Sequence, residues 1–148
     1  MRAWVVAVAL MLSACHDPMS PAESALASAE SRWNASRPAS NSYVFWQSRA
    51  CFCIIGGVSH EVTVVNGTIA SVKNLATGAV LPADQFGLFR TVAQLFGDLR
   101  AAIKSPGVLQ AAEYDTTIGY PTVVSLDPIK NAIDDEISYR SSHFVPSG

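Results

Sequence analysis

The sequence has no cluster of basic residues, no second long hydrophobic segment and none of the common catalytic motifs. Its ten lysines and arginines are scattered singly and are outnumbered by twelve acidic residues, which gives a formal net charge of −2. Proteins that bind nucleic acid or anionic membrane surfaces usually concentrate basic residues on one face. The composition therefore argues against both classes, and we expect no nucleic-acid partner.

Catalytic and metal-binding signatures are also missing. There is no glycine–serine nucleophile elbow, no phosphate-binding loop and no HExxH motif. Cys51, Cys53, His60 and His143 are residue types that bind zinc, but their spacing matches no standard zinc pattern. The acidic run Asp134-Asp135-Glu136 lacks the alternating ligands and the glycine of a calcium loop. We therefore predict a protein that is not an enzyme and holds no metal or other cofactor.

The N-terminus carries the most informative segment of the chain. Arg2 precedes an apolar run at residues 3–12, and Ser13, Ala14 and Cys15 follow it. Such a run is too short to cross roughly 30 Å of hydrocarbon, which takes about twenty residues, and it is typical of a secretory signal peptide. The cysteine after two small residues resembles the lipobox of bacterial lipoproteins. This resemblance implies a diacylglycerol on the Cys15 sulfur, cleavage before Cys15 and acylation (palmitate) of the new amino terminus.

The chain then divides into three parts. Residues 1–14 form the signal peptide, residues 15–19 a lipidated tether and residues 20–148 a single domain. Removing the signal removes one basic and no acidic residue, which leaves a net charge of −3. By resemblance to Gram-negative sorting rules, His16 after the lipidated cysteine favours the outer membrane, with the domain in the periplasm. The expected membrane partner is reached only through the lipid on Cys15.

Two helices are predicted from capping boxes. Ser20 and Glu23 form one ahead of a helix over residues 21–35, and Thr91 and Gln94 form another ahead of a helix that a Ser-Pro-Gly sequence ends. Residues 74–90 are expected to form a loop with at most a short irregular strand.

The strand pattern completes the predicted fold. An Asn66-Gly67 type I′ turn predicts a hairpin that pairs Val64 with Ile69, although the buried face of this hairpin stays open. The order helix, three strands, helix, two or three strands indicates an α+β domain with one antiparallel sheet of four to six strands and two helices packed on it. The predicted strands cover residues 41–55, 62–65, 68–72, 108–114, 121–126 and 137–144.

Spaced motifs along the chain resemble a family of bacterial lipoproteins catalogued only as a domain of unknown function. The resemblance covers roughly residues 30–145 and implies the same fold and the same envelope location, and it adds nothing about chemistry. The residues that carry it are Trp33, Tyr43, Cys51-Phe52-Cys53, Asn66-Gly67, Gly119-Tyr120-Pro121 and Asp134-Asp135-Glu136.

Cys51 and Cys53 are the sharpest chemical candidates. Residues two apart in a strand lie about 6.6–6.8 Å apart, the upper end of the range of about 4.4–6.8 Å that disulfides span between Cα atoms. A bridge is therefore possible but stretched. A strained, redox-active bridge, a structural bridge and two packed thiols remain alternatives.

Tyr114, Tyr120 and Pro121 surround Gly119 in an aromatic turn. This turn either offers an interaction surface or covers the open end of the sheet. We expect a lipid-anchored envelope protein that binds an envelope partner through an edge strand or this aromatic loop. The alternatives are a redox-responsive protein that uses Cys51 and Cys53, and a structural or stress-related lipoprotein without a specific ligand.

Overall fold

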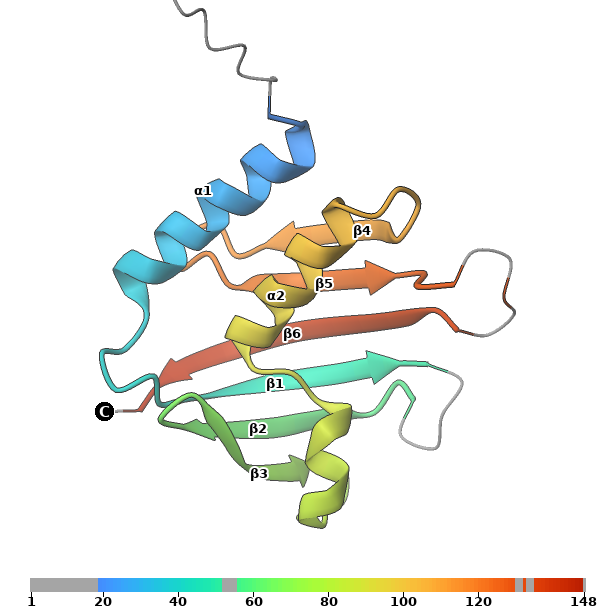
Figure 1. Ribbon diagram of the computed structural model, residues 1–148. Helices are drawn as coiled ribbons and strands as arrows, with labels where there is room; N and C mark the ends of the chain where they lie inside the picture. The colour runs from blue at the N-terminus through green and yellow to red at the C-terminus, as the bar shows by residue number, and fades with distance from the viewer. Residues whose placement is uncertain (1–18, 52–55, 130–131, 133–134, 148) are drawn as a thin grey trace, which may run out of the picture.

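The computed structural model describes residues 19–51, 56–129, 132 and 135–147 (Figure 1). Within these residues the chain alternates helices with groups of three strands, as the sequence predicted. In chain order the elements are α1 (Pro21–Ser36), β1 (Tyr43–Ala50), β2 (Ser59–Val65), β3 (Thr68–Asn74), the 3₁₀ helix η1 (Ala83–Leu88), α2 (Val92–Ile103), β4 (Leu109–Tyr114), β5 (Pro121–Leu126) and β6 (Ile137–Pro146).

The strands form one six-stranded antiparallel sheet in the order β3-β2-β1-β6-β5-β4. The first and last strands of the chain, β1 and β6, are therefore neighbours at its centre, with Tyr43 opposite Pro146 and Ala50 opposite Ser138. The β2–β3 hairpin turns at Asn66 and Gly67, whose φ angles of 51° and 79° are those that a type I′ turn requires. The predicted pairing of Val64 with Ile69 is confirmed.

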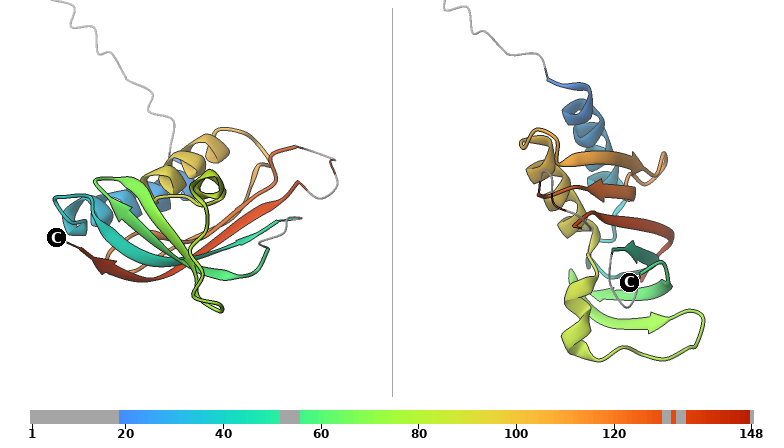
Figure 2. Two further views of the ribbon diagram at one scale, coloured as in Figure 1. Left: turned by 90° about the horizontal axis from the view of Figure 1, so that it is seen from below. Right: turned by 90° about the vertical axis from the view of Figure 1, so that its right-hand side faces the viewer.

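Both α-helices and η1 cover the same face of the sheet (Figures 1 and 2). Alternate residues of β1 and β2 point into the core beneath them, which answers the open question of which hairpin face is buried. The predicted α+β fold is therefore confirmed. The buried core consists of Leu26, Ala29, Trp33, Tyr43, Phe45, Val62, Val64, Val72, Phe89, Val92, Leu95, Phe96, Leu99, Tyr120, Val124 and Tyr139.

One buried polar side chain ties the central strand to the start of α2. Gln47 on β1 is only 1% exposed. Its Nε2 donates to the Arg90 carbonyl at 3.2 Å, and its Oε1 accepts from the Arg90 N–H at 2.9 Å. The amide thus satisfies both backbone groups of the residue before the helix cap, where an apolar side chain would leave them unpaired.

The loop between β4 and β5 lies directly against α1. Gly119 has φ +93°, and a Cβ placed on it would be 2.3 Å from the Ala29 carbonyl oxygen and 2.9 Å from the Trp33 nitrogen. Only glycine fits this backbone-to-backbone contact. The contact fixes how far α1 stands above the sheet.

The segment between β3 and α2 differs from its prediction. An isolated bridge pairs Lys73 with Val80, and η1 follows it, where a loop with a short irregular strand was expected. A single 3₁₀ turn gives no long periodic pattern in a sequence. Its side chains Phe86 and Leu88 are held by packing against the core.

The opposite face of the sheet has no helix over it among the described residues (Figure 2). There Trp46 of β1 stacks on His143 of β6, with 3.6 Å between ring centroids. No described helix combines the length and the apolar character needed to cross a membrane.

Candidate functional site

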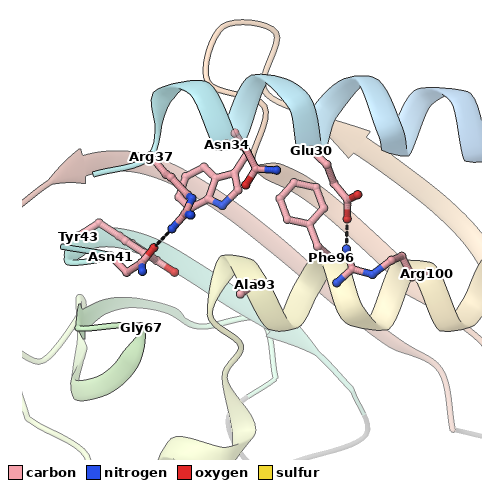
Figure 3. Close-up of a pocket in the computed structure, with 10 residues that line it drawn as sticks. Glu30, Asn34, Arg37, Asn41, Tyr43, Gly67, Ala93, Phe96 and Arg100 are labelled. Atoms are coloured by element: carbon pink, nitrogen blue, oxygen red, sulfur yellow. Dashed lines mark hydrogen bonds and ion pairs between the residues drawn. The ribbon is translucent and has the colours of Figure 1, made fainter. Parts of the chain in front are cut away.

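A cleft of about 340 Å³ opens between α1 and α2, next to the β2–β3 turn (Figure 3). We call it the interhelical cleft. It has an aromatic floor and a mostly polar rim, and concave sites with several convergent polar groups are candidates for binding small ligands. Its lining residues are Glu30, Trp33, Asn34, Arg37, Asn41, Tyr43, Gly67, Ala93, Phe96 and Arg100.

The wall formed by α1 is one stripe of the helix surface. Glu30, Asn34 and Arg37 follow each other at spacings of four and three residues, so their side chains project to the same side. Arg37 is the C-cap residue, with φ −63° and ψ 146°, and its N–H donates to the Trp33 carbonyl. Pro38 disfavours a helical conformation at Arg37, so the helix ends here and this side chain stands at the mouth of the cleft.

The wall formed by α2 is a matching stripe. Ala93, Phe96 and Arg100 recur at spacings of three and four residues. Ala93 has a small side chain on the cleft side, which leaves space between the helices. Arg100 reaches across to Glu30 on α1 and forms an ion pair with it (Figure 3).

The floor is held rigidly. The Tyr43 phenol oxygen accepts the Val92 N–H at 3.0 Å, which satisfies one of the free donors in the first turn of α2. Trp33 packs edge-on against Tyr43, with 5.7 Å between ring centroids. Burial raises the pKa of the Tyr43 phenol above its ordinary value, although the Val92 hydrogen bond acts in the opposite direction. The phenol is therefore neutral at physiological pH.

The charges of the cleft do not cancel. Glu30 and Arg100 compensate each other, whereas the Arg37 guanidinium donates to the neutral Asn41 side chain. Within the described part of the chain, no carboxylate forms an ion pair with Arg37. A guanidinium presents a planar set of donors that matches a carboxylate or phosphate. The cleft therefore offers one cation to an anionic group of a ligand.

The model of a family of unknown function, DUF6174, matches residues 25–146, which cover the whole sheet, α2 and all of α1 except its first turn. The chain belongs to this family. No curated protein and no solved structure matches the chain. Membership of DUF6174 confirms the part of the resemblance that concerns a domain of unknown function. The lipoprotein character remains a prediction.

In this DUF6174 domain the aromatic turn is largely buried. Tyr120 is 6% exposed and stacks on Phe144, with 5.5 Å between ring centroids. Pro121 is buried and Tyr114 half-buried. The burial of Tyr120 and Pro121 favours the second alternative for these two residues, which cover the end of the sheet, and an interaction surface at Tyr114, Tyr120 and Pro121 stays a prediction.

The predicted cysteine sites lie at or beyond the edge of the described structure. Cys51 is half-buried directly after β1. Cys53, like the lipidation site Cys15, lies outside the described residues. The pairing of Cys51 with Cys53 and the redox alternative built on it therefore stay predictions.

The two histidines of the described structure, His60 and His143, are not brought together. His60 lies in the core, with its Nδ1 3.0 Å from the Val58 carbonyl oxygen and its ring against Phe89. His143 stacks on Trp46 on the open face of the sheet. The described residues contain no group of three or more histidine, cysteine and acidic side chains that could hold a metal ion.

The acidic residues of the loops serve local turns. The Asp115 carboxylate accepts the N–H groups of Thr117 and Ile118, and the Asp135 carboxylate accepts that of Ile129. The Asp115 contacts are the Asx-type contacts expected of a turn, whereas the Asp135 contact reaches back six residues and ties the two ends of its loop together. Asp134 lies outside the described residues.

The interhelical cleft itself was not predicted from the sequence. Its residues come from both helices, from the start of β1 and from the hairpin turn, so no local motif contains them. One available signal was a set of small or polar residues on the outer side of two helices whose other sides are apolar. Asn34 on α1 and Ala93 on α2 are such positions.

Proposed function

We propose that this chain is a lipid-anchored protein of the bacterial cell envelope whose domain binds a small anionic ligand in the interhelical cleft, without catalysing a reaction. The single observation that carries the binding function is the uncompensated Arg37 at the rim of a cleft with an aromatic floor. The lipobox ending in Cys15 supports the anchor. His16 supports the outer membrane as its location, with the domain facing the periplasm.

The chemistry of the cleft favours binding over catalysis. Asn34 and Asn41 add amide donors next to the Arg37 guanidinium, so an anionic group meets several hydrogen-bond donors at once. Among the described residues that line the cleft, Glu30 is the one carboxylate, and its ion-pair partner is Arg100 on the opposite helix. General acid–base catalysis needs a group positioned and free to exchange a proton. The cleft thus supplies recognition groups and no such catalytic group.

The binding function is tested on protein purified from its own envelope. Native mass spectrometry of the wild-type chain should show a bound species that is lost in Arg37→Gln. The control is Arg140→Gln, which removes an exposed arginine from β6, away from the cleft, and should keep the bound species. Wild-type protein that carries no bound species, or equal loading of the two variants, would contradict the proposal.

The anchor is tested separately. Cells that express the chain and take up labelled palmitate should label the wild-type protein, and Cys15→Ser should be unlabelled and released from the membrane fraction. A Cys15→Ser protein that stays membrane-bound and is processed normally would refute lipidation. This result would not bear on ligand binding in the interhelical cleft.

A further inference from the structure

The interhelical cleft continues into a second hollow along the same two helices. This hollow, of about 220 Å³, shares Glu30 and Arg100 with the cleft. Its lining differs in character, since Met19, Leu26, Ala27 and Ile103 are apolar. Glu23 and Lys104 stand at its edge. One groove therefore runs between α1 and α2, polar at one end and apolar at the other, and the Glu30–Arg100 pair lies at the junction.

We infer that the ligand of this groove is a single-chain amphiphile with a carboxylate head, a fatty acid in chemical terms. The inference rests on the proposed function and names its ligand class. The carboxylate lies at Arg37, and the hydrocarbon chain runs along α1 toward Leu26 and Met19. The change of the groove lining from polar to apolar matches the two ends of such a molecule.

The polar end selects the head group. Arg37 carries one positive charge that no described carboxylate compensates, so a singly charged anion balances it. A carboxylate also fits the parallel donors of a guanidinium. A cationic or neutral head would leave Arg37 unpaired.

The apolar end selects the tail. Met19 is 63% exposed, although it stands beside the apolar side chains of Leu26 and Ile103. Ala27 is too small to fill the space in front of it. A hydrocarbon chain in this hollow would cover apolar surface that is now in water, at a gain proportional to the area covered.

The length of the groove sets the length of the tail. Ala27 and Arg37 are ten residues apart in one helix, which corresponds to about 15 Å at about 1.5 Å per residue. A zigzag chain with C–C bonds near 1.5 Å advances about 1.3 Å per carbon. About twelve carbons therefore reach from the head at Arg37 to the hollow at Ala27.

The predicted position of the lipid anchor agrees with the direction in which the hydrocarbon chain runs along α1. Cys15 precedes Met19 by four residues, so a lipid on Cys15 holds the first turn of α1 within about 14 Å of the membrane surface. The apolar end of the groove is then the end nearest to the lipids.

The test uses residues 15–148 with Cys15→Ser, because all core residues lie between Leu26 and Phe144 and this chain keeps them. Trp46→Phe leaves Trp33, on the cleft floor, as its one tryptophan. Linear carboxylates from acetate to tetradecanoate are titrated below their micelle concentrations, and the affinity is followed by Trp33 fluorescence. Dodecanol and dodecyltrimethylammonium serve as head-group controls.

We expect the affinity for carboxylates to rise about two- to fourfold per methylene and to level off near twelve carbons. Arg37→Gln should weaken dodecanoate at least tenfold, and Ala27→Phe should abolish the dependence on chain length while acetate still binds. Ala25→Phe is the matched control, because Ala25 is exposed on the other side of α1, and it should leave the series unchanged.

Four results would overturn the inference. Equal affinity for acetate and dodecanoate would mean that the cleft binds anions without a tail, and the proposed function would stand. Equal loss in Ala27→Phe and Ala25→Phe, or equal binding of dodecanol, would mean that the chain binds hydrocarbon without using the groove and its arginine. No binding of any carboxylate would exclude this ligand class, and native mass spectrometry of the envelope protein would still decide the proposed function.

Discussion

Gly119→Ala tests whether the β4–β5 loop sets the position of α1, and with it the width of the interhelical cleft. The added Cβ would lie 2.3 Å from the Ala29 carbonyl oxygen and 2.9 Å from the Trp33 nitrogen, both of them backbone atoms in the middle of a helix. Contacts under 3.0 Å are essentially never seen for Cβ atoms. Because backbone cannot move aside as a side chain can, α1 must shift by several tenths of an ångström.

The cost has two parts. Holding alanine at φ +93° costs about 1–2 kcal/mol, since its Cβ crowds the neighbouring carbonyl. Forcing extra volume into a packed contact costs a further 1–3 kcal/mol or so. The free energy of unfolding should therefore fall by about 2–5 kcal/mol. This is a large fraction of the 5–15 kcal/mol typical of a domain.

Urea denaturation gives the free energy of unfolding of Gly119→Ala and of a matched variant. The difference between the two isolates the packing part of the cost. Gly107→Ala is the control, because Gly107 has a similar φ of +86° and a Cβ added to it would meet no atom within 4 Å. It should lose only the conformational part, about 1–2 kcal/mol. If Gly119→Ala loses no more than Gly107→Ala at an unchanged m value, the loop does not press on α1 and the reasoning fails.

Three further predictions concern the stability of the same domain. Gln47→Leu should lower the free energy of unfolding by about 2–4 kcal/mol in urea melts, because it leaves the part-buried N–H and carbonyl of Arg90 without their side-chain partner. A loss below 1 kcal/mol or so would contradict this. Thr91→Ala should cost about 1 kcal/mol, the usual value of an N-cap, with Thr91→Ser as the conservative control. Burial raises the pKa of Tyr43 and Tyr139 above the ordinary value of 10.0, so the native state keeps protons that the unfolded chain releases. Stability should thus be complete below pH 10 and fall as the pH rises further, and urea midpoints that do not change between about pH 9 and pH 11 would refute this.

Most of the fold follows from local signals in the sequence. The capping box at Ser20 and the one at Thr91 fix the starts of α1 and α2, and both are present in the structure with their reciprocal hydrogen bonds. The Asn66-Gly67 turn fixes the hairpin register, because few other residues accept two consecutive positive φ angles. These features depend on residues within a few positions of each other, and they were predicted correctly.

Features that depend on contacts between residues far apart in the sequence were not predicted. The pairing of β1 with β6 joins segments about one hundred residues apart, and no local pattern specifies it. The interhelical cleft depends on that pairing and on the spacing that Gly119 imposes between its loop and α1. For the same reason the aromatic residues near Gly119 were ambiguous. The packing of Tyr120 on Phe144 places Tyr120 in the core, which no local pattern could show.

The Glu30–Arg100 pair illustrates how stability and binding can be separated in this groove. The Arg100 side chain is 52% exposed and that of Glu30 is 26% exposed, and an ion pair in such surroundings contributes only about 0–1 kcal/mol. The helices are held together by their buried side chains, so the pair is not required for the fold. Because it joins the polar and apolar halves of the groove and costs little to open, a ligand that occupies both halves can pass beneath it without disturbing the core. The placement of a weak contact at this junction, with Leu26 and Phe96 buried below it, agrees with the ligand class that we propose for the groove.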